Sequence, residues 1–290
     1  MSLLDRLLFF KPKPPTVAVL RLGGVIGQLG PLRAGMSLAA LAPSLERAFS
    51  LGGLKAVALI VNSPGGSPVQ SALICQRIRA LAADKDVPVI AFVEDVAASG
   101  GYWLACAADE IFAQEASIVG SIGVISAGFG FSEALRRLGV ERRVYTAGEK
   151  KGLLDPFQPE NPDDVARLKA LQAEIHDGFK SLVRDRRGSR LKGTEDELFS
   201  GAFWSGRRAL DLGLIDGIAD LRGELHRRYG EKVRLRLIAP SRGWLQKRLA
   251  PSAALSPDDL VAASGGVGAN LAHGLLAALE ERALWGRYGL

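Results

Sequence analysis

"AVALIV" at residues 56–61 and "VPVIAFV" at residues 87–93 frame a unit that decides the predicted fold class. Both runs are rich in β-branched residues and apolar on both faces, which is typical of strands buried inside a parallel sheet. Residues 69–83, between them, follow a helical pattern. Parallel neighbours need such a crossover helix, so this unit predicts an α/β fold.

The same alternation continues on both sides of the unit. "TVAVLRL" at residues 16–22 is predicted to be the first strand. Strands are also expected in "EIFA" (110–113), "SIGVI" (121–125), "RRVYTA" (142–147) and "LIDGI" (214–218). Helices are expected at about 100–108, 132–138, 162–187, 205–212 and 219–229. Together these elements predict one main domain over residues 16–230.

Both ends of the chain differ from this domain. Residues 1–15, "MSLLDRLLFFKPKPP", form an amphipathic and Pro-rich tail that is too short for a membrane span and lacks a signal-peptide cleavage site. Residues 231–290 comprise a last strand, a linker and an Ala/Leu-rich amphipathic helix at 267–285. Either end suits a membrane surface or packing against protein equally well. We expect a cytoplasmic protein, or one peripheral to the inner (cytoplasmic) membrane, without a transmembrane span.

Composition excludes several function classes. The net charge is +6, but the basic residues are dispersed and no aromatic-interleaved basic stripe occurs, which argues against nucleic-acid binding. The two cysteines, Cys75 and Cys106, lie in apolar helical runs without metal-ligand spacing, so we predict buried, reduced thiols. No metal or cofactor is expected.

A single serine stands out in "VEDVAASGGYWLACAADEIFA", residues 93–113. Ser99 lies between a predicted strand and a predicted helix, where it is either a helix cap or an exposed nucleophile. A nucleophile needs a base. The three histidines, His176, His226 and His273, all fall in predicted helices of the second half, away from any glycine-rich or strand-end segment.

Lysine is the other candidate base, because burial lowers its pKa and leaves a neutral amine. "TAGEKKGLLDPF" offers Lys150 and Lys151 after a predicted strand. "VNSPGGSPVQSA", residues 61–72, is a glycine-rich turn between a strand and a helix, where free backbone N–H groups can stabilise an oxyanion. It lacks the P-loop pattern, which argues against a nucleotide site.

Four segments, in order, resemble the S49 family of peptidases, which includes signal peptide peptidase A. They are "VNSPGGSPVQSA", "AASGGYWLACAADEIFAQEASIVGSIGVI", "GEKKGLLDPF" and "FSGAFWSGRRALDLGLIDGI", and the resemblance spans about residues 16–225. It implies an α/β fold of the ClpP/crotonase-like kind, a spiral of β-β-α units, here followed by a C-terminal helical extension. It also implies assembly into rings, tetrameric or octameric, with sites completed across subunits.

The resemblance further implies roles for individual residues. Ser99 matches the nucleophile, and Lys151 rather than Lys150 matches the general base. Gly66 matches an oxyanion glycine, Gly100 is the plausible second oxyanion donor, and Ser121 matches a serine that orients the lysine amine. The interval of 52 residues between Ser99 and Lys151 fits the short, single-domain form of the family. Asp155 lies close in sequence to the lysine, where a carboxylate facing the amine would favour its charged form.

The implied activity is a Ser/Lys endopeptidase that cleaves extended hydrophobic peptides through an acyl-enzyme, without cofactor or metal. Its substrates would be signal-peptide remnants or other membrane-derived or unfolded peptides. Two alternatives remain open: a crotonase-type acyl-CoA enzyme, and a non-catalytic peptide-binding scaffold. The role of the extension beyond residue 231 is also open, between covering a ring edge, anchoring the assembly and blocking the groove.

Overall fold

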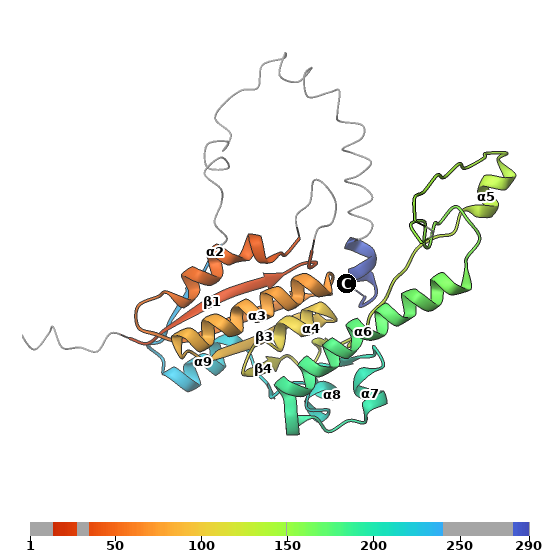
Figure 1. The fold of residues 1–290 in the computed structure, drawn as a ribbon. Helices are drawn as coiled ribbons and strands as arrows, with labels where there is room; N and C mark the ends of the chain where they lie inside the picture. Colours follow the sequence, from red (N-terminus) through yellow and green to blue (C-terminus); the bar gives the residue numbers. More distant parts are fainter. Residues whose placement is uncertain (1–13, 28–34, 149, 240–280, 290) are drawn as a thin grey trace, which may run out of the picture.

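One mixed β-sheet forms the centre of the protein. The computed structural model describes residues 14–27, 35–148, 150–239 and 281–289 (Figure 1). Within them the sheet has eight strands: β1 Thr16–Gly23, β2 Leu54–Ser63, β3 Val89–Ala98, β4 Glu110–Ala113, β5 Ile118–Gly120, β6 Phe203–Ser205, β7 Gly217–Ile218 and β8 Arg234–Leu237. The order along the sheet is β6-β5-β3-β2-β1-β8, and every pairing is parallel except that of β5 with β6.

The sheet divides at β3, which positions the candidate site. Residues 90–92 of β3 pair with β4, whereas residues 96–98 pair with β5. On the first branch β4 also pairs with β7. Because β5 lies beside the end of β3, the residue that follows β3 meets the loop that follows β5.

Between β1 and β8 the structure describes eight α-helices, and all but α5 bury residues in the core around the sheet. They are α2 Leu38–Phe49, α3 Pro68–Lys85, α4 Gly100–Ala105, α5 Ser132–Arg137, α6 Pro162–Arg187, α7 Glu195–Phe199, α8 Gly206–Asp211 and α9 Leu221–Tyr229, with a 3₁₀ turn at Gly188–Arg190. The larger core cluster packs α2, α3, α4, α6 and α8 against one face. A smaller cluster packs α9, through Leu225, against the other face.

Local capping explains why α6 has the predicted bounds. Asn161 accepts a hydrogen bond from the Asp163 N–H, Pro162 occupies the first turn, and Asp163 and Asp164 add negative charge there. The helix ends at Arg187 and is followed by the C-cap residue Gly188, whose φ is 51°. The prediction for residues 162–187 is confirmed.

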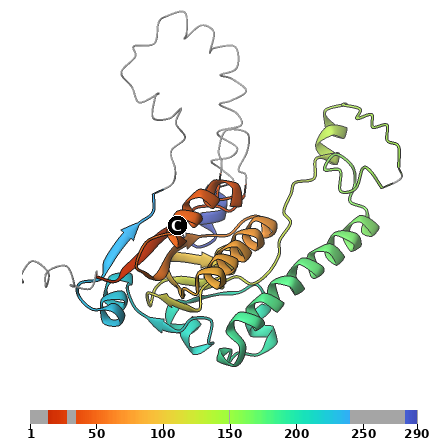
Figure 2. The same cartoon turned by 60° about the vertical axis from the view of Figure 1, so that its left-hand side comes forward.

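Two predicted strands are wrong. The apolar run at residues 121–125 is not a strand, because β5 ends at Gly120 and Ser121 has a φ of 52°, which breaks the extended backbone. Residues 142–147 lie exposed outside the sheet and pair with no strand of the described chain. They belong to residues 123–148 and 150–161, called the arm from here on, which project beyond the N-terminal end of α6 (Figures 1 and 2).

The predictions for the ends of the chain are tested only in part. The amphipathic part of the N-terminal tail, the linker and most of the helix predicted at 267–285 lie outside the described residues. Residues 281–286 are helical. The predicted last strand is confirmed, since β8 pairs with β1 in the main sheet.

A buried ion pair fastens α6 to this sheet. The Arg187 side chain is 1% exposed and donates two hydrogen bonds to Asp216, at 2.7 and 3.0 Å. Burial alone would raise the pKa of the Asp216 carboxyl, but hydrogen bonds from Arg187 and the Ile111 N–H, with the charges of Arg187 and Arg190, hold that pKa below its usual range. The pair therefore contributes stability only while Asp216 is ionised.

We expect Asp216→Asn to destabilise the fold by about 3 kcal/mol, because it leaves the buried Arg187 guanidinium without a counter-charge. The melting temperature should fall by roughly 10 °C. Glu195→Gln is the control, since Glu195 pairs with Arg184 at the solvent-exposed surface and its loss should leave the melting temperature close to that of wild type. Equal melting temperatures for the two variants would contradict the assigned role of the buried pair.

Candidate active site

Ser99 occupies a strained turn between β3 and α4. Its φ of 52° and ψ of −123° lie in a region that residues other than glycine rarely adopt. The Ser99 N–H donates to Gly120 O at 2.8 Å, and Ser99 O accepts from the Trp103 N–H at 3.0 Å. The side chain makes no capping hydrogen bond to the helix, so its hydroxyl is not occupied as a cap. A half-buried serine held this way presents its Oγ at the carboxyl edge of the sheet.

The turn between β2 and α3 lies directly against Ser99. A Cβ atom on Gly65 would come within 2.8 Å of Ser99 Cβ and 2.9 Å of Gly100 N. A Cβ on Gly66 would come within 2.0 Å of Ile26 O. The φ values of these two glycines are 107° and 141°. Only glycine therefore permits this approach of the two backbones.

The close approach brings two backbone N–H groups to the same place. The Ile26 N–H donates to Gly65 O, and the Ser67 N–H donates to Ile26 O. The N–H of Gly66, between these two bonds, has no acceptor among the described residues. Gly100 is the first residue of α4, where a helix N–H has no partner within the helix. Two such donors beside a serine hydroxyl can stabilise a negatively charged oxygen.

Ser121 is brought to the same edge by β5. It follows Gly120, the residue that accepts the Ser99 N–H, and its own N–H donates to Ala202 O at 2.7 Å. Its Oγ accepts a 3.4 Å hydrogen bond from Tyr288 Oη. The predicted residues Ser99, Gly66, Gly100 and Ser121 therefore converge on one edge.

His176 corrects the expectation that the histidines stand apart from this region. Helix α6 carries its half-buried ring to the loop after β5, where Nε2 lies 3.0 Å from Ile122 O. The neighbouring helical turn is held to α4 by stacking of Phe179 on Trp103 at 4.6 Å. No local pattern could reveal this contact, because 54 residues separate its partners.

Lys151 does not join this group within one chain. It is exposed, in a turn of the arm. The Leu154 N–H ties that turn to Asp164 Oδ2, at 3.2 Å, in the first turn of α6. Asp164 and His176 are about 18 Å apart along the α6 axis. His176 is the α6 residue that contacts the loop after β5, beside Ser99, so the turn with Lys151 lies at the far end of the helix. Between the described residues, no hydrogen bond links Lys151 to Ser99.

The acidic neighbour of the lysine has other partners. Asp155 accepts hydrogen bonds from the Phe157 N–H at 3.0 Å and from Arg142 Nε at 2.9 Å. The bond from the Phe157 N–H has the largest effect on the carboxyl. Together with the bond from Arg142 it outweighs desolvation and holds the pKa of Asp155 below its usual value. Asp155 is thus an ionised partner of Arg142 rather than a group hydrogen-bonded to Lys151.

The two cysteines and Tyr102 are structural residues. Cys75 and Cys106 are buried free thiols as predicted, and burial raises their pKa values to about 11 and about 12. Both are therefore poor nucleophiles. Tyr102 is fully buried and donates to Leu214 O at 2.7 Å. No group of three or more His, Cys, Asp or Glu side chains suited to a metal ion occurs in the part of the chain that the structure describes.

Comparison with known families accounts for this arrangement. A family model described as "Peptidase family S49" matches residues 82–230, just over half of the chain. This chain belongs to peptidase family S49. The match includes Ser99, Gly100, Ser121 and Lys151, and it ends just after α9. Gly66 lies ahead of the matched residues.

Individual relatives cover this S49 chain to different extents. The Na(+)/H(+) antiporter NhaA of Brucella abortus (strain 2308) is 52% identical over 97% of this chain, which spans 38% of that relative. The putative signal peptide peptidase SppA of Enterococcus faecium is 33% identical over 57% of this chain and 47% of its own length. The chain thus spans less than half the length of either relative.

A solved structure shares the fold. The 1510-N membrane-bound stomatin-specific protease, as a lysine-to-alanine mutant in complex with a substrate peptide, aligns with a TM-score of 0.50 at 17% identity, over 82% of this chain and 97% of that one. With the forked sheet, this confirms the predicted ClpP/crotonase-like class. None of the helices in the described residues is long and apolar enough to cross a bilayer.

Proposed function

We propose that this S49 chain is a serine endopeptidase in which Ser99 is the nucleophile and Lys151 the general base. One observation carries the proposal: a strained Ser99, free of any capping role, lies against the glycine turn, and the N–H groups of Gly66 in that turn and of Gly100 in α4 have no acceptor among the described residues. Backbone strain of this kind costs free energy and persists where function requires it. The S49 membership supports the same reaction class.

The proposed reaction proceeds in two halves. Neutral Lys151 takes the Ser99 proton as Oγ attacks the scissile carbonyl, while the Gly66 and Gly100 N–H groups bind the oxyanion. The amine leaves with the proton returned by Lys151, and an acyl-enzyme remains. Lys151 then removes a proton from water, which attacks the ester carbonyl. The bond to Ser99 Oγ breaks, Lys151 returns the proton to Oγ, and the new carboxyl group is released. Ser121 Oγ is assigned the role of orienting the lysine amine.

Assembly of several copies is part of the proposal, because Lys151 lies away from Ser99 in one chain. Most of the exposed large apolar side chains are concentrated in the arm: Ile125, Phe129, Phe131, Leu138, Val140, Val144, Tyr145, Leu154 and Phe157. An apolar surface of this kind favours burial against protein. We assign a second copy of the chain as the partner, within a homo-oligomeric ring. The arm of one copy would bring Lys151 to the Ser99 of the next copy, where the contact shields the amine from water.

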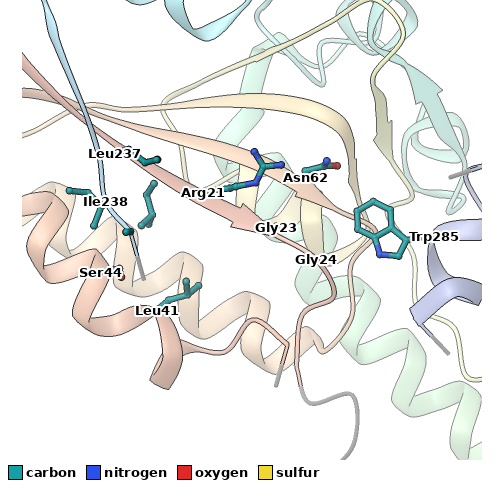
Figure 3. Close-up of a pocket in the computed structure, with 11 residues that line it drawn as sticks. Arg21, Gly23, Gly24, Leu41, Ser44, Asn62, Leu237, Ile238 and Trp285 are labelled. Atoms are coloured by element: carbon teal, nitrogen blue, oxygen red, sulfur yellow. The ribbon is translucent and has the colours of Figure 1, made fainter. Parts of the chain in front are cut away.

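The proposed substrates are extended hydrophobic peptides, including signal-peptide remnants and other membrane-derived or unfolded segments. An apolar cavity of about 550 Å³ lies beside the glycine turn, lined by Leu20, Leu41, Leu237 and Ile238, with Arg21, Ser44 and Asn62 as its polar side chains (Figure 3). Such a lining accepts apolar side chains. A peripheral membrane location would supply substrates of this class.

The name of the Brucella relative does not determine this proposal. The shared region covers 97% of this chain, so it includes residues 82–230, which match the S49 family. The antiporter name describes a protein of which this chain spans 38%. The S49 region is therefore the part on which a function for this chain can be based.

A covalent serine probe tests the proposal. We expect a fluorophosphonate to modify Ser99, located by mass spectrometry of the digested protein, and to abolish cleavage of Leu- and Ala-rich fluorogenic peptides. Modification elsewhere, with peptide cleavage retained, would overturn the assignment of Ser99. Turnover of acyl-CoA thioesters without peptide cleavage would favour the crotonase-type alternative. Peptide binding without turnover by assembled protein would favour the scaffold.

A further inference from the structure

The end of the chain lies on the edge of the sheet that carries Ser99. Residues 281–286 are helical and 287–289 form a turn. Figure 1 shows this segment beside the ends of α3 and α4 that follow the two glycine turns. Residues 281–289, called the terminal segment from here on, thus share one surface with the candidate site.

Tyr288 makes the contacts that place the terminal segment there. Its hydroxyl lies 3.4 Å from Ser121 Oγ and 3.5 Å from Pro64 O, and donates toward both. Its ring packs edge-on against Phe203, with the centroids 5.2 Å apart. Pro64 precedes the Gly65 that touches Ser99, and Ser121 follows the Gly120 that binds the Ser99 N–H. Tyr288 therefore covers both loops that flank the nucleophile.

Trp285, three residues earlier, forms a wall of the neighbouring apolar cavity. Figure 3 shows its indole near Gly24 and Asn62, at the opposite end of the cavity from Leu237 and Ile238. Asn62 is close to the glycine turn and bonds to Asp95 and the Val96 N–H of β3. Trp285 thus lies where the cavity meets the turn of the candidate site.

We propose that the terminal segment is an intramolecular block, which a peptide substrate must displace to reach Ser99. The inference rests on the proposed function and adds its regulation. The terminal segment is chemically suited to this surface, because Trp285 lines the apolar cavity and Tyr288 packs against the Phe203 ring. The same features make an apolar, aromatic-containing peptide the competitor that displaces it most readily.

The attachment is suited to reversible displacement. The two hydrogen bonds of Tyr288 are long, and the contact with Phe203 is a single edge-on pair, so each is weak. Residues 240–280 separate β8 from the terminal segment along the chain.

Variants of the 290-residue chain test the block. The double variant Trp285→Ala/Tyr288→Ala should raise kcat/KM for fluorogenic peptides about tenfold, because a larger fraction of sites is open. Arg282→Ala/Arg287→Ala is the matched control, since both arginines are exposed in the same segment, and it should match wild type. A synthetic peptide of residues 281–290 should inhibit the double variant again. Equal kcat/KM in the double variant and wild type, at equal melting temperature, would overturn the inference.

A second measurement needs no turnover. Both chains compared here carry Ser99→Ala, and one of them also carries Trp285→Ala/Tyr288→Ala. A fluorescently labelled peptide of residues 281–290 should bind the chain with the double substitution about tenfold more tightly, because in the other chain the terminal segment competes with the peptide. Tyr288→Phe, which keeps the ring, should give a smaller increase. Equal affinities would overturn the block even if wild type cleaves peptides. If no chain cleaves peptides while the affinities differ as expected, the proposed function is wrong, but the inference that the terminal segment occupies the surface beside Ser99 is supported.

Discussion

Ser99→Ala is expected to lower kcat/KM for peptide cleavage by about 10³-fold or more, as the loss of a nucleophile does in other hydrolases. The fold should survive, because alanine and serine bear similar strain at a φ of 52° and the Ser99 side chain makes no capping bond. Kinetics on a fluorogenic peptide, with melting temperature and oligomer size from the same samples, measure the effect.

Ser189→Ala is the control for this variant. Ser189 is exposed in the 3₁₀ turn after α6, distant in sequence from the residues at the site. It should retain wild-type kinetics. Activity of Ser99→Ala within a few fold of wild type would remove Ser99 from the mechanism and shift attention to a water nucleophile or another serine.

Lys151→Ala should also lower turnover by about 10³-fold, because no base is left to take the serine proton. Its neighbour provides a close control. Lys150 is also exposed and lies in the same turn, so Lys150→Ala changes the charge of the arm by the same amount without removing the proposed base. If only the Ser99 variant is inactive, the base is elsewhere, and the His176 ring near Ile122 is the first alternative to test.

Mixing the two inactive variants tests whether sites are completed between copies. If Lys151 serves the Ser99 of a neighbour, random co-assembly of Ser99→Ala with Lys151→Ala chains should restore about a quarter of the sites. If each chain supplies both residues to its own site, the mixture stays inactive. The exposed position of Lys151 at the far end of α6 leads us to expect restoration.

Elements with strong local signals could be predicted from the sequence. The helix over 162–187 follows from an Asn cap, a proline in the first turn and two following aspartates, all contained within four residues. The strands β1 to β3 follow from apolar β-branched runs, and the turn around Ser99 from glycines after a strand. These signals depend on neighbouring residues alone, so no tertiary information is needed to recognise them.

Other elements could not be predicted, because distant residues decide them. The run at 121–125 has strand-like composition, yet the backbone leaves the extended conformation at Ser121, whose φ is 52° and whose N–H donates to the distant Ala202 O. Residues 142–147 are also strand-like, but no described strand is available to pair with them. Composition gives a preference for a strand, whereas pairing depends on where other strands lie.

The sequence by itself determined the α/β class, the buried thiols, the order of the S49 segments, and four residues that converge at one edge: Ser99, Gly66, Gly100 and Ser121. Tertiary structure alone decided that Lys151 lies apart from them, that His176 reaches Ile122, and that Tyr288 contacts Ser121. The physical reason is range. Turns and caps are set by dihedral preferences of adjacent residues, whereas Tyr288 and Ser121, 167 residues apart, meet only once the sheet has brought both segments to its carboxyl edge.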